Sequence, residues 1–335
     1  MTTDAGRALV LGGGGVLGFA WSVGALRAWQ DHTGIDPRRN ELIVGTSAGS
    51  VLGALLACGV SVDVIERHHQ GVPLPADPGI DWTYEDEAGA LPPWPGWRPG
   101  SPRLVLDAVR HLRSTPPAVA LSGLLPRGRG TLQPIHDMIA ATSLATLPGQ
   151  NWPVHPKMWV VGTDYDSGRR VIFGRDRVSA VLADAVCASC AIPAWYPPVK
   201  IDGRQFIDGG AASNASVDVL LPLVEAGTIR TVLVVVPMAA QEFDRPRSPV
   251  TRLERVVRRA ITRGIEADAQ ALRMAGAEVS VLAPVAADLT EMGPNLMNPR
   301  RRTRVLQTAL DTVSARLAGR RPEQPLGDAI GGAPG

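Results

Sequence analysis

Short apolar runs alternate along this 335-residue chain with longer segments whose apolar residues recur at helical spacing. Runs of strand length occupy residues 8–11, 43–44, 158–161, 205–207, 232–236 and 279–282. Helices are predicted at residues 18–31, 50–58, 131–142, 177–187 and 249–275, with a last helix starting at residues 298–299. Strands without polar alternation are typical of a parallel sheet that is covered on both faces. The pattern therefore predicts an α/β fold in which a mainly parallel central sheet carries helices on both sides, a three-layer α/β/α arrangement.

The chain divides into a core and two segments of different composition. We expect residues 5–320 to form a single domain, because 45% hydrophobic content at this length is enough for a full core. Within it, residues 71–130 hold 11 of the 29 prolines together with Trp82, Trp94 and Trp97. Such a segment is predicted to be an irregular insertion, either a lid that meets lipid or a static flap whose tryptophans pack inward. Residues 321–335 are expected to be a disordered tail.

Charge and cysteine content narrow the class of protein. Lys and Arg total 34 against 32 Asp and Glu, a net charge of +2 that gives no case for nucleic acid as a partner. Three cysteines, an odd number, favour reduced thiols and a cytoplasmic location. Cys187 and Cys190 form a C-x-x-C pair, but no second pair or nearby histidine completes a zinc site. We therefore expect these cysteines to be packing residues, and we expect no metal.

The 19-residue uncharged run at residues 8–26 has the length of a membrane span. Five glycines crowd between residues 12 and 18, which favours a buried strand, a loop and an amphipathic helix instead. Peripheral contact with the inner face of a membrane stays open. Arg252, Arg255 and Arg259 share one face of the helix at 249–275, and more arginines crowd residues 300–304. A solvated arginine face is the alternative interpretation.

Residues 43–49 read Ile-Val-Gly-Thr-Ser-Ala-Gly, a short strand that runs directly into G-x-S-x-G. This is the pattern of a nucleophile elbow, a sharp strand-to-helix turn that holds a serine hydroxyl up at the carboxyl end of a sheet. Gly45 and Gly49 leave room for that turn. Ser47 is therefore the candidate nucleophile.

Four consecutive glycines at residues 12–15 separate the first strand from the first helix, and Gly18 follows at the start of that helix. Backbone amides in such a loop form a concavity for negative charge. The amides of Gly13, Gly14 and Gly15 are candidate oxyanion-hole donors. Removing one such donor typically lowers the rate about a hundred-fold or more.

The same glycines formally fit a dinucleotide-binding fingerprint, G-x-G-x-x-G, with Asp36 at roughly the distance of a ribose-binding acid. Asp36, however, precedes Pro37 in a turn instead of ending a strand. The next strand ends in the serine elbow, which also argues against a nucleotide site. A nucleotide site is kept as the rival hypothesis to the oxyanion hole.

A serine nucleophile needs a base, and the distribution of histidines argues against an imidazole. The last 180 residues contain no histidine, whereas an ordinary α/β-hydrolase places its catalytic histidine late in the chain. We read all six histidines as surface or packing residues. Asp208 is the expected base, because it ends an apolar strand and is followed by Gly209 and Gly210, which allow close backbone approach. Asp164 and Asp166 lack such a glycine pair and are predicted to stabilise a turn.

Together these motifs resemble those of the patatin-like phospholipase family. Residues 13–18 are similar to its glycine-rich oxyanion loop, residues 45–49 to its serine elbow, and residues 208–210 to its Asp-Gly-Gly motif. Residues 188–199 resemble the segment that precedes the aspartate, and the likeness covers about residues 8–222. Leu17 is a departure, because family members often carry Arg or Lys there.

The resemblance implies a dyad of Ser47 and Asp208 that works without histidine, metal or other cofactor on an acyl-lipid substrate. We predict hydrolysis of carboxylic esters of phospholipids or other acyl lipids, of the phospholipase A or lysophospholipase type. Two alternatives stay open. One is an acyltransferase that uses the same acyl-enzyme, and the other is a non-catalytic regulator that binds nucleotide or lipid.

Overall fold

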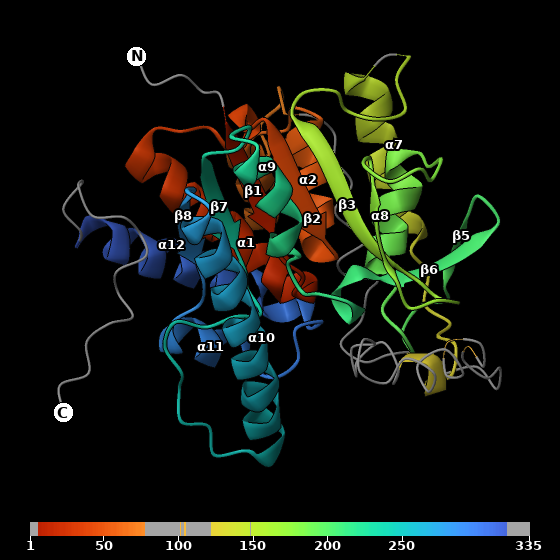
Figure 1. The fold of residues 1–335 in the computed structure, drawn as a ribbon. Coiled ribbons are helices and arrows are strands. Elements are labelled where there is room, and N and C mark those ends of the chain that lie inside the picture. Colours follow the sequence, from red (N-terminus) through yellow and green to blue (C-terminus); the bar gives the residue numbers. More distant parts are fainter. Residues whose placement is uncertain (1–5, 78–100, 102–103, 105–121, 148, 320–335) are drawn as a thin grey trace.

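The computed structural model describes residues 6–77, 101, 104, 122–147 and 149–319. Most of the proline-rich insertion, with Trp82, Trp94 and Trp97, lies outside the described residues, as does the expected tail at 321–335. What is described comprises a central sheet and the helices packed on it (Figure 1).

The sheet has the strand order β5-β6-β3-β2-β1-β7-β8, with β4 paired to β3. Its five adjacent parallel strands are β3 (Lys157–Asp164), β2 (Leu42–Thr46), β1 (Arg7–Leu11), β7 (Thr231–Val235) and β8 (Glu278–Leu282). The antiparallel strands β4 (Arg170–Phe173), β6 (Arg204–Asp208) and β5 (Val199–Ile201) extend it at one end. The predicted, mainly parallel sheet is confirmed.

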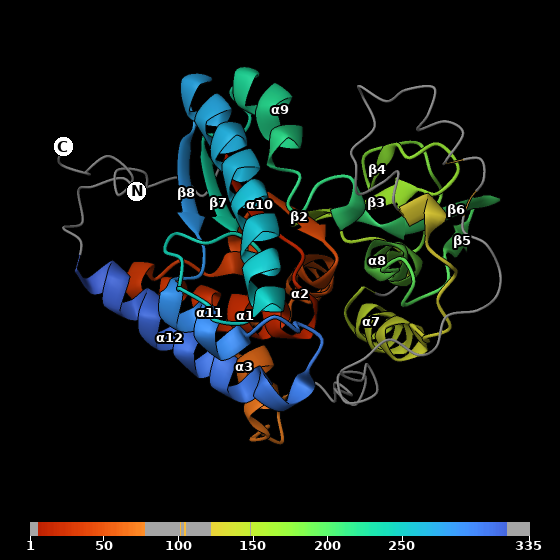
Figure 2. The same cartoon turned by 90° about the horizontal axis from the view of Figure 1, so that it is seen from below.

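Alternate residues of each strand enter two separate cores, one on each face of the sheet. In β1, Leu9 and Leu11 pack into one core, whereas Ala8 and Val10 pack into the other. The first core is covered by α1 (Gly15–Thr33), α2 (Ala48–Ala57), α3 (Val62–Gln70), α7 (Gln133–Thr146), α8 (Leu182–Cys190), α11 (Ala286–Met292) and α12 (Arg302–Ala318). The second is covered by α9 (Leu221–Glu225) and α10 (Pro249–Met274). Figure 2 shows α9 and α10 on one side of the strands and α1, α11 and α12 on the other, so helices cover both faces as predicted.

Two predicted helix starts are wrong. The helix expected from residue 177 starts at Leu182, because Asp176 closes a turn after β4 by accepting a hydrogen bond from the Ile172 amide at 2.8 Å. The first helix starts at Gly15 instead of Gly18, so the last glycine of the loop belongs to its first turn. The uncharged run at residues 8–26 forms β1, the loop and part of α1, and none of the described helices is long and apolar enough to cross a membrane.

Candidate active site

Ser47 occupies the turn between β2 and α2, with a φ of +52° that side-chain-bearing residues seldom adopt. Its amide donates a hydrogen bond to the hydroxyl of Ser189 at 2.8 Å, and that hydroxyl donates to the Val161 carbonyl at 2.6 Å. Ser189, near the end of α8, thus ties the strained turn to β3. A side chain at Gly49 would place its Cβ 2.2 Å from the Leu11 carbonyl oxygen, so this turn requires glycine. The predicted elbow is present.

Strand register brings Ser47 and Asp208 to the same level of the sheet. Thr46 in β2 pairs with Val161 in β3, and the next residue of β3, Gly162, pairs with Asp208 in β6. The two candidate residues therefore lie on either side of β3, at its carboxyl end. They are 161 positions apart along the chain but only two strands apart in the fold.

The Asp208 carboxyl group is buried next to Ser47. It accepts a hydrogen bond from the Gly210 amide at 2.6 Å. Burial raises the pKa of Asp208 to about 6, although hydrogen bonding from Ser47 and Gly210 acts in the opposite direction. Because Gly209 would place a Cβ 2.3 Å from the Val161 carbonyl oxygen, glycine is needed for β6 to approach β3 this closely.

The glycine loop lies directly beside the elbow. A Cβ at Gly13 would stand 3.2 Å from the Cβ of Ser47. The Gly13 amide, however, donates to the Asn214 carbonyl at 3.0 Å, so it is already engaged, and only Gly14 and Gly15 of the three expected donors stay candidates. Gly14 caps α1 and Gly15 is its first residue, so their amides face outward from the helix start. In the described part of the chain, neither of these two amides is paired with an acceptor.

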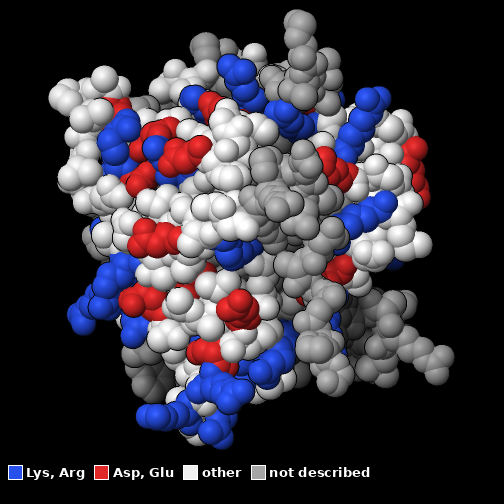
Figure 3. Space-filling view, turned by 90° about the vertical axis from the view of Figure 1, so that its left-hand side faces the viewer, with Lys and Arg blue, Asp and Glu red and all other residues white. Residues whose placement is uncertain are grey.

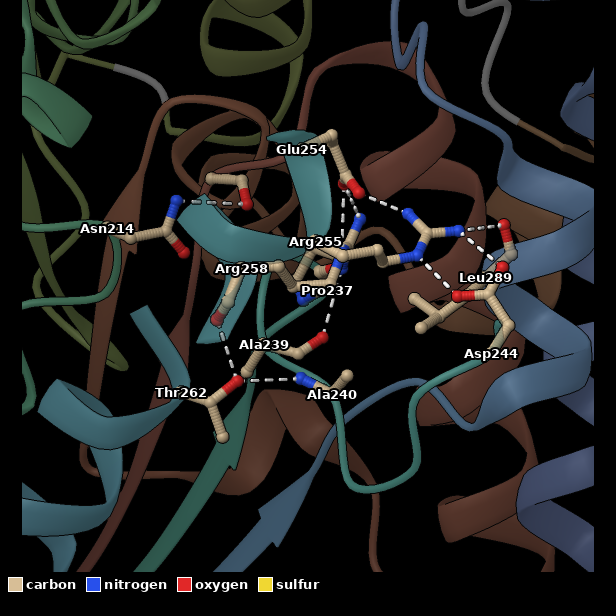
Figure 4. A network of polar contacts seen from close by, with 11 residues as sticks. Asn214, Pro237, Ala239, Ala240, Asp244, Glu254, Arg255, Arg258, Thr262 and Leu289 are labelled. Atoms are coloured by element: carbon tan, nitrogen blue, oxygen red, sulfur yellow. Dashed lines mark hydrogen bonds and ion pairs between the residues drawn. The ribbon is translucent and has the colours of Figure 1, made fainter. Parts of the chain in front are cut away.

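The glycine loop is held in place by contacts on two sides, with Pro237 and with Leu296. On one side, the Pro237 ring is so close that a Cβ at Gly14 would approach its Cγ to 2.8 Å. The Pro237 carbonyl in turn accepts a hydrogen bond from the buried guanidinium of Arg258, which also donates to Ala239 at 3.0 Å (Figure 4). On the other side, the Leu17 amide donates to the Leu296 carbonyl at 2.9 Å. Leu17 itself is fully buried in the core, so it takes a packing role where family members often carry a cation.

A largely apolar cavity opens in front of Ser47. It runs between the start of α1, the start of α2 and the helices α7 and α8. Its apolar walls include Phe19, Val51, Ile135, Ile192 and Met297. No histidine is among its lining residues in the described ranges. The cavity can therefore accept an apolar chain whose polar end reaches the hydroxyl of Ser47.

Asp164, the competing candidate for the base, and Asp36, the acid expected in a nucleotide site, both have other partners. Asp164 accepts hydrogen bonds from the Ser167 amide and hydroxyl at 2.8 and 2.7 Å and pairs with Arg204, which is the turn role predicted for it. Asp36 caps a short turn and pairs with Arg38, outside any strand end. The proposed ribose-binding acid is thus engaged with its own neighbour.

The cysteines and the buried histidine are packing residues. Cys187 and Cys190 are buried in α8 without a disulfide. His69 packs against Phe19 with ring centroids 5.2 Å apart, and burial lowers the pKa of His69 to about 3. Across the described residues, no three His, Cys, Asp or Glu side chains gather closely enough to hold a metal ion.

Sequence reasoning did not identify Ser189 or Asn214 as site residues. Ser189 lies in the stretch that resembles the family segment, but only the fold reveals that its hydroxyl holds the elbow. Asn214 follows the Asp-Gly-Gly motif without a pattern of its own. Its contact with Gly13 depends on the path of the chain after β6.

The profile of the patatin-like phospholipase family matches residues 9–221. The chain belongs to the patatin-like phospholipase family. This match spans the glycine loop, the elbow and Asp208, and it ends before α10.

Uncharacterized NTE family proteins of Mycobacterium bovis and Mycobacterium tuberculosis are 29% identical over 203 residues. The alignment covers 61% of this chain and 42% of each relative, so the chain matches less than half the length of these proteins. Among solved structures, VipD from Legionella pneumophila overlaps with a TM-score of 0.43 at 16% identity, covering 94% of this chain and 67% of VipD. The type III effector protein ExoU overlaps with a TM-score of 0.38 at 18% identity, covering 94% and 53%.

Proposed function

We propose that this protein is a lipid acyl hydrolase that cleaves carboxylic esters with Ser47 as nucleophile and Asp208 as base. The observation that carries the proposal is a buried carboxyl group, placed beside Ser47 by the strand register, whose pKa is raised to about 6. An ordinary aspartate is a weak base for a hydroxyl, and a raised pKa brings it closer to the range in which general bases work. Family membership supports lipid esters as the substrate class.

The reaction proceeds in two halves. In the first, Asp208 takes the proton of the Ser47 hydroxyl while the oxygen attacks the acyl carbonyl. The amides of Gly14 and Gly15, at the amino end of α1, stabilise the oxyanion that forms, and the alcohol leaves with the proton held by Asp208. In the second half, Asp208 takes a proton from water, which attacks the acyl carbonyl of the acyl-enzyme. The bond to the Ser47 oxygen then breaks, the fatty acid leaves, and Asp208 returns the proton to the Ser47 oxygen.

The cavity supports an acyl lipid over a small polar ester. Its apolar walls would hold the hydrocarbon chain, and the polar atoms of Ser47 lie where the carbonyl must sit. The elbow strain supports the same role, because a positive φ at a non-glycine residue costs of order 1–3 kcal/mol and is typical of functional turns. The cytoplasmic location expected from the cysteines stays a prediction.

Hydrolysis assays on two variants test the proposal. Ser47→Ala and Asp208→Asn should each lower turnover of a long-chain ester at least about a thousand-fold while remaining folded. Asp164→Asn is the matched control, because it alters the rival carboxylate at the end of a neighbouring strand and should keep most of the activity. Wild-type hydrolysis by a folded Ser47→Ala variant would refute the proposal.

A further inference from the structure

The first three turns of α10 have an inverted amphipathic pattern. In residues 249–260, the buried side chains are Arg255 and Arg258, at 1% and 0% exposure. Val250, Leu253, Val256 and Val257 are instead 67%, 67%, 57% and 49% exposed. The spacing of Val250, Leu253 and Val257 places them on one face of the helix. We name these four residues the α10 apolar face.

Polar contacts explain why the arginines lie inside. Arg255 pairs with Asp244 and Glu254 and donates to the Leu289 carbonyl at 2.9 Å. Arg258 pairs with the same Glu254 at 2.9 Å and holds the carbonyls beside the glycine loop (Figure 4). This half of α10 is thus anchored by ion pairs, and its apolar side chains are left outward. The expected exposed face of Arg252, Arg255 and Arg259 is therefore wrong for Arg255.

Exposed arginines accompany the α10 apolar face on the same half of the helix and in the loop before it. Five arginines of this region are exposed, namely Arg245, Arg247, Arg252, Arg259 and Arg263. Glu242 and Glu266 are exposed with them, whereas Asp244 and Glu254 are paired with buried arginines. Figure 3 shows basic side chains gathered at the lower tip of the molecule, where Figure 1 has the amino-terminal end of α10. Exposed apolar residues flanked by arginines are typical of helices that lie on anionic bilayers.

The α10 apolar face lies beyond the sheet edge that carries Ser47. The chain leaves the carboxyl end of β7 and, after a loop, enters the amino end of α10. The 26 residues of α10 span about 39 Å at 1.5 Å per residue, against about 17 Å for the five residues of β7. Its contacts with the core begin at Ile261, in the middle of the helix, and continue through Ile265, Ala269 and Leu272. The first half therefore projects past the carboxyl edge, as Figure 1 shows.

We propose that the α10 apolar face and its flanking arginines dock the protein onto the surface of an anionic phospholipid bilayer. The inference rests on the proposed function, since it places the lipid hydrolase on the surface that holds its substrate. Charge favours a bilayer over a second copy of this chain. In a symmetric dimer the same patch would face itself, and five arginines would meet five others.

Vesicle flotation tests the proposal, with phosphatidylcholine alone compared with phosphatidylcholine and phosphatidylserine at about 7:3. The wild type should float with the anionic vesicles only. Leu253→Gln with Val257→Gln should weaken that binding roughly ten-fold or more, and Arg252→Gln with Arg259→Gln roughly 25-fold, at about five-fold per arginine. Met274→Gln is the matched control, because Met274 is 80% exposed at the other end of α10 and should not matter.

Each outcome is decisive. Equal flotation of the wild type and both double variants would overturn the proposal. A wild-type dimer that ignores vesicles and dissociates in the Leu253/Val257 variant would assign the surface to a second copy instead. The variants of α10 should all hydrolyse a soluble short-chain ester at the wild-type rate, which shows that they are folded. Ser47→Ala should float like the wild type, so a failure of docking and a failure of the proposed nucleophile are scored separately.

Discussion

The raised pKa of Asp208 predicts that Asp208→Asn stabilises the protein as it abolishes activity. Burial raises this pKa from 3.8 to about 6, so the charged carboxylate is less favourable in the folded protein than in the unfolded chain. A difference of about two pKa units corresponds to about 3 kcal/mol. The stability contributed by the protonated form is complete below about pH 4 and is lost as the pH rises through about 6. Asparagine carries no charge at any pH and should escape this loss.

Urea unfolding of the wild type and Asp208→Asn at several pH values measures the difference. The variant should be more stable by up to about 3 kcal/mol near pH 8, and the gap should close toward about pH 4. Asp268, on α10, offers the control. Burial and repulsion from Asp218 also raise the pKa of Asp268 to about 6, and Asp268 is not part of the candidate active site. Asp268→Asn should shift stability in the same direction without loss of turnover. A variant at Asp208 that is less stable at every pH would refute the reasoning.

Three further results are expected. Asp208 must be deprotonated to act as a base, so kcat/KM for a neutral ester should rise with pH through about 6; a midpoint near 3.8 would contradict this. Gly14→Ala places a Cβ 2.8 Å from Pro237, so the loop must shift and kcat should fall about 100-fold with little change in KM, in steady-state assays. Ser189→Ala removes the acceptor of the Ser47 amide and should cost about 1–3 kcal/mol of unfolding free energy in urea titrations, with lower kcat; unchanged values would exclude its positioning role.

The strands of the parallel sheet and the elbow could be predicted because they are encoded locally. Apolar runs without alternation mark strands buried on both faces, and G-x-S-x-G marks the turn at Ser47. The strands β4 and β5 were not predicted, because each is short and pairs at the end of the sheet with a partner that the local pattern does not reveal. The start of α8 at Leu182 was missed for a similar reason, since the Asp176 turn depends on its pairing with Ile172.

The parts of the candidate site that could be predicted from the sequence are those that have glycines beside them. Asp208 was predicted as the base from the glycines that follow it, and the fold explains Gly209 through the close approach to Val161. The loss of Gly13 as an oxyanion donor was not predictable, because its partner is a carbonyl 201 positions later, at Asn214. The inverted pattern of α10 could not be predicted either. The positions of the arginines in the sequence do not reveal which of them pair with Asp244 or Glu254 and become buried.

Labelling with a fluorophosphonate tests the central claim most directly, because the reagent reacts with an activated serine. Intact-mass and peptide analysis should find a single adduct on Ser47 of the wild type, and no adduct on a folded Ser47→Ala variant. The Asp208→Asn variant should react much more slowly. An adduct on another residue, or equal labelling of Ser47→Ala, would contradict the account.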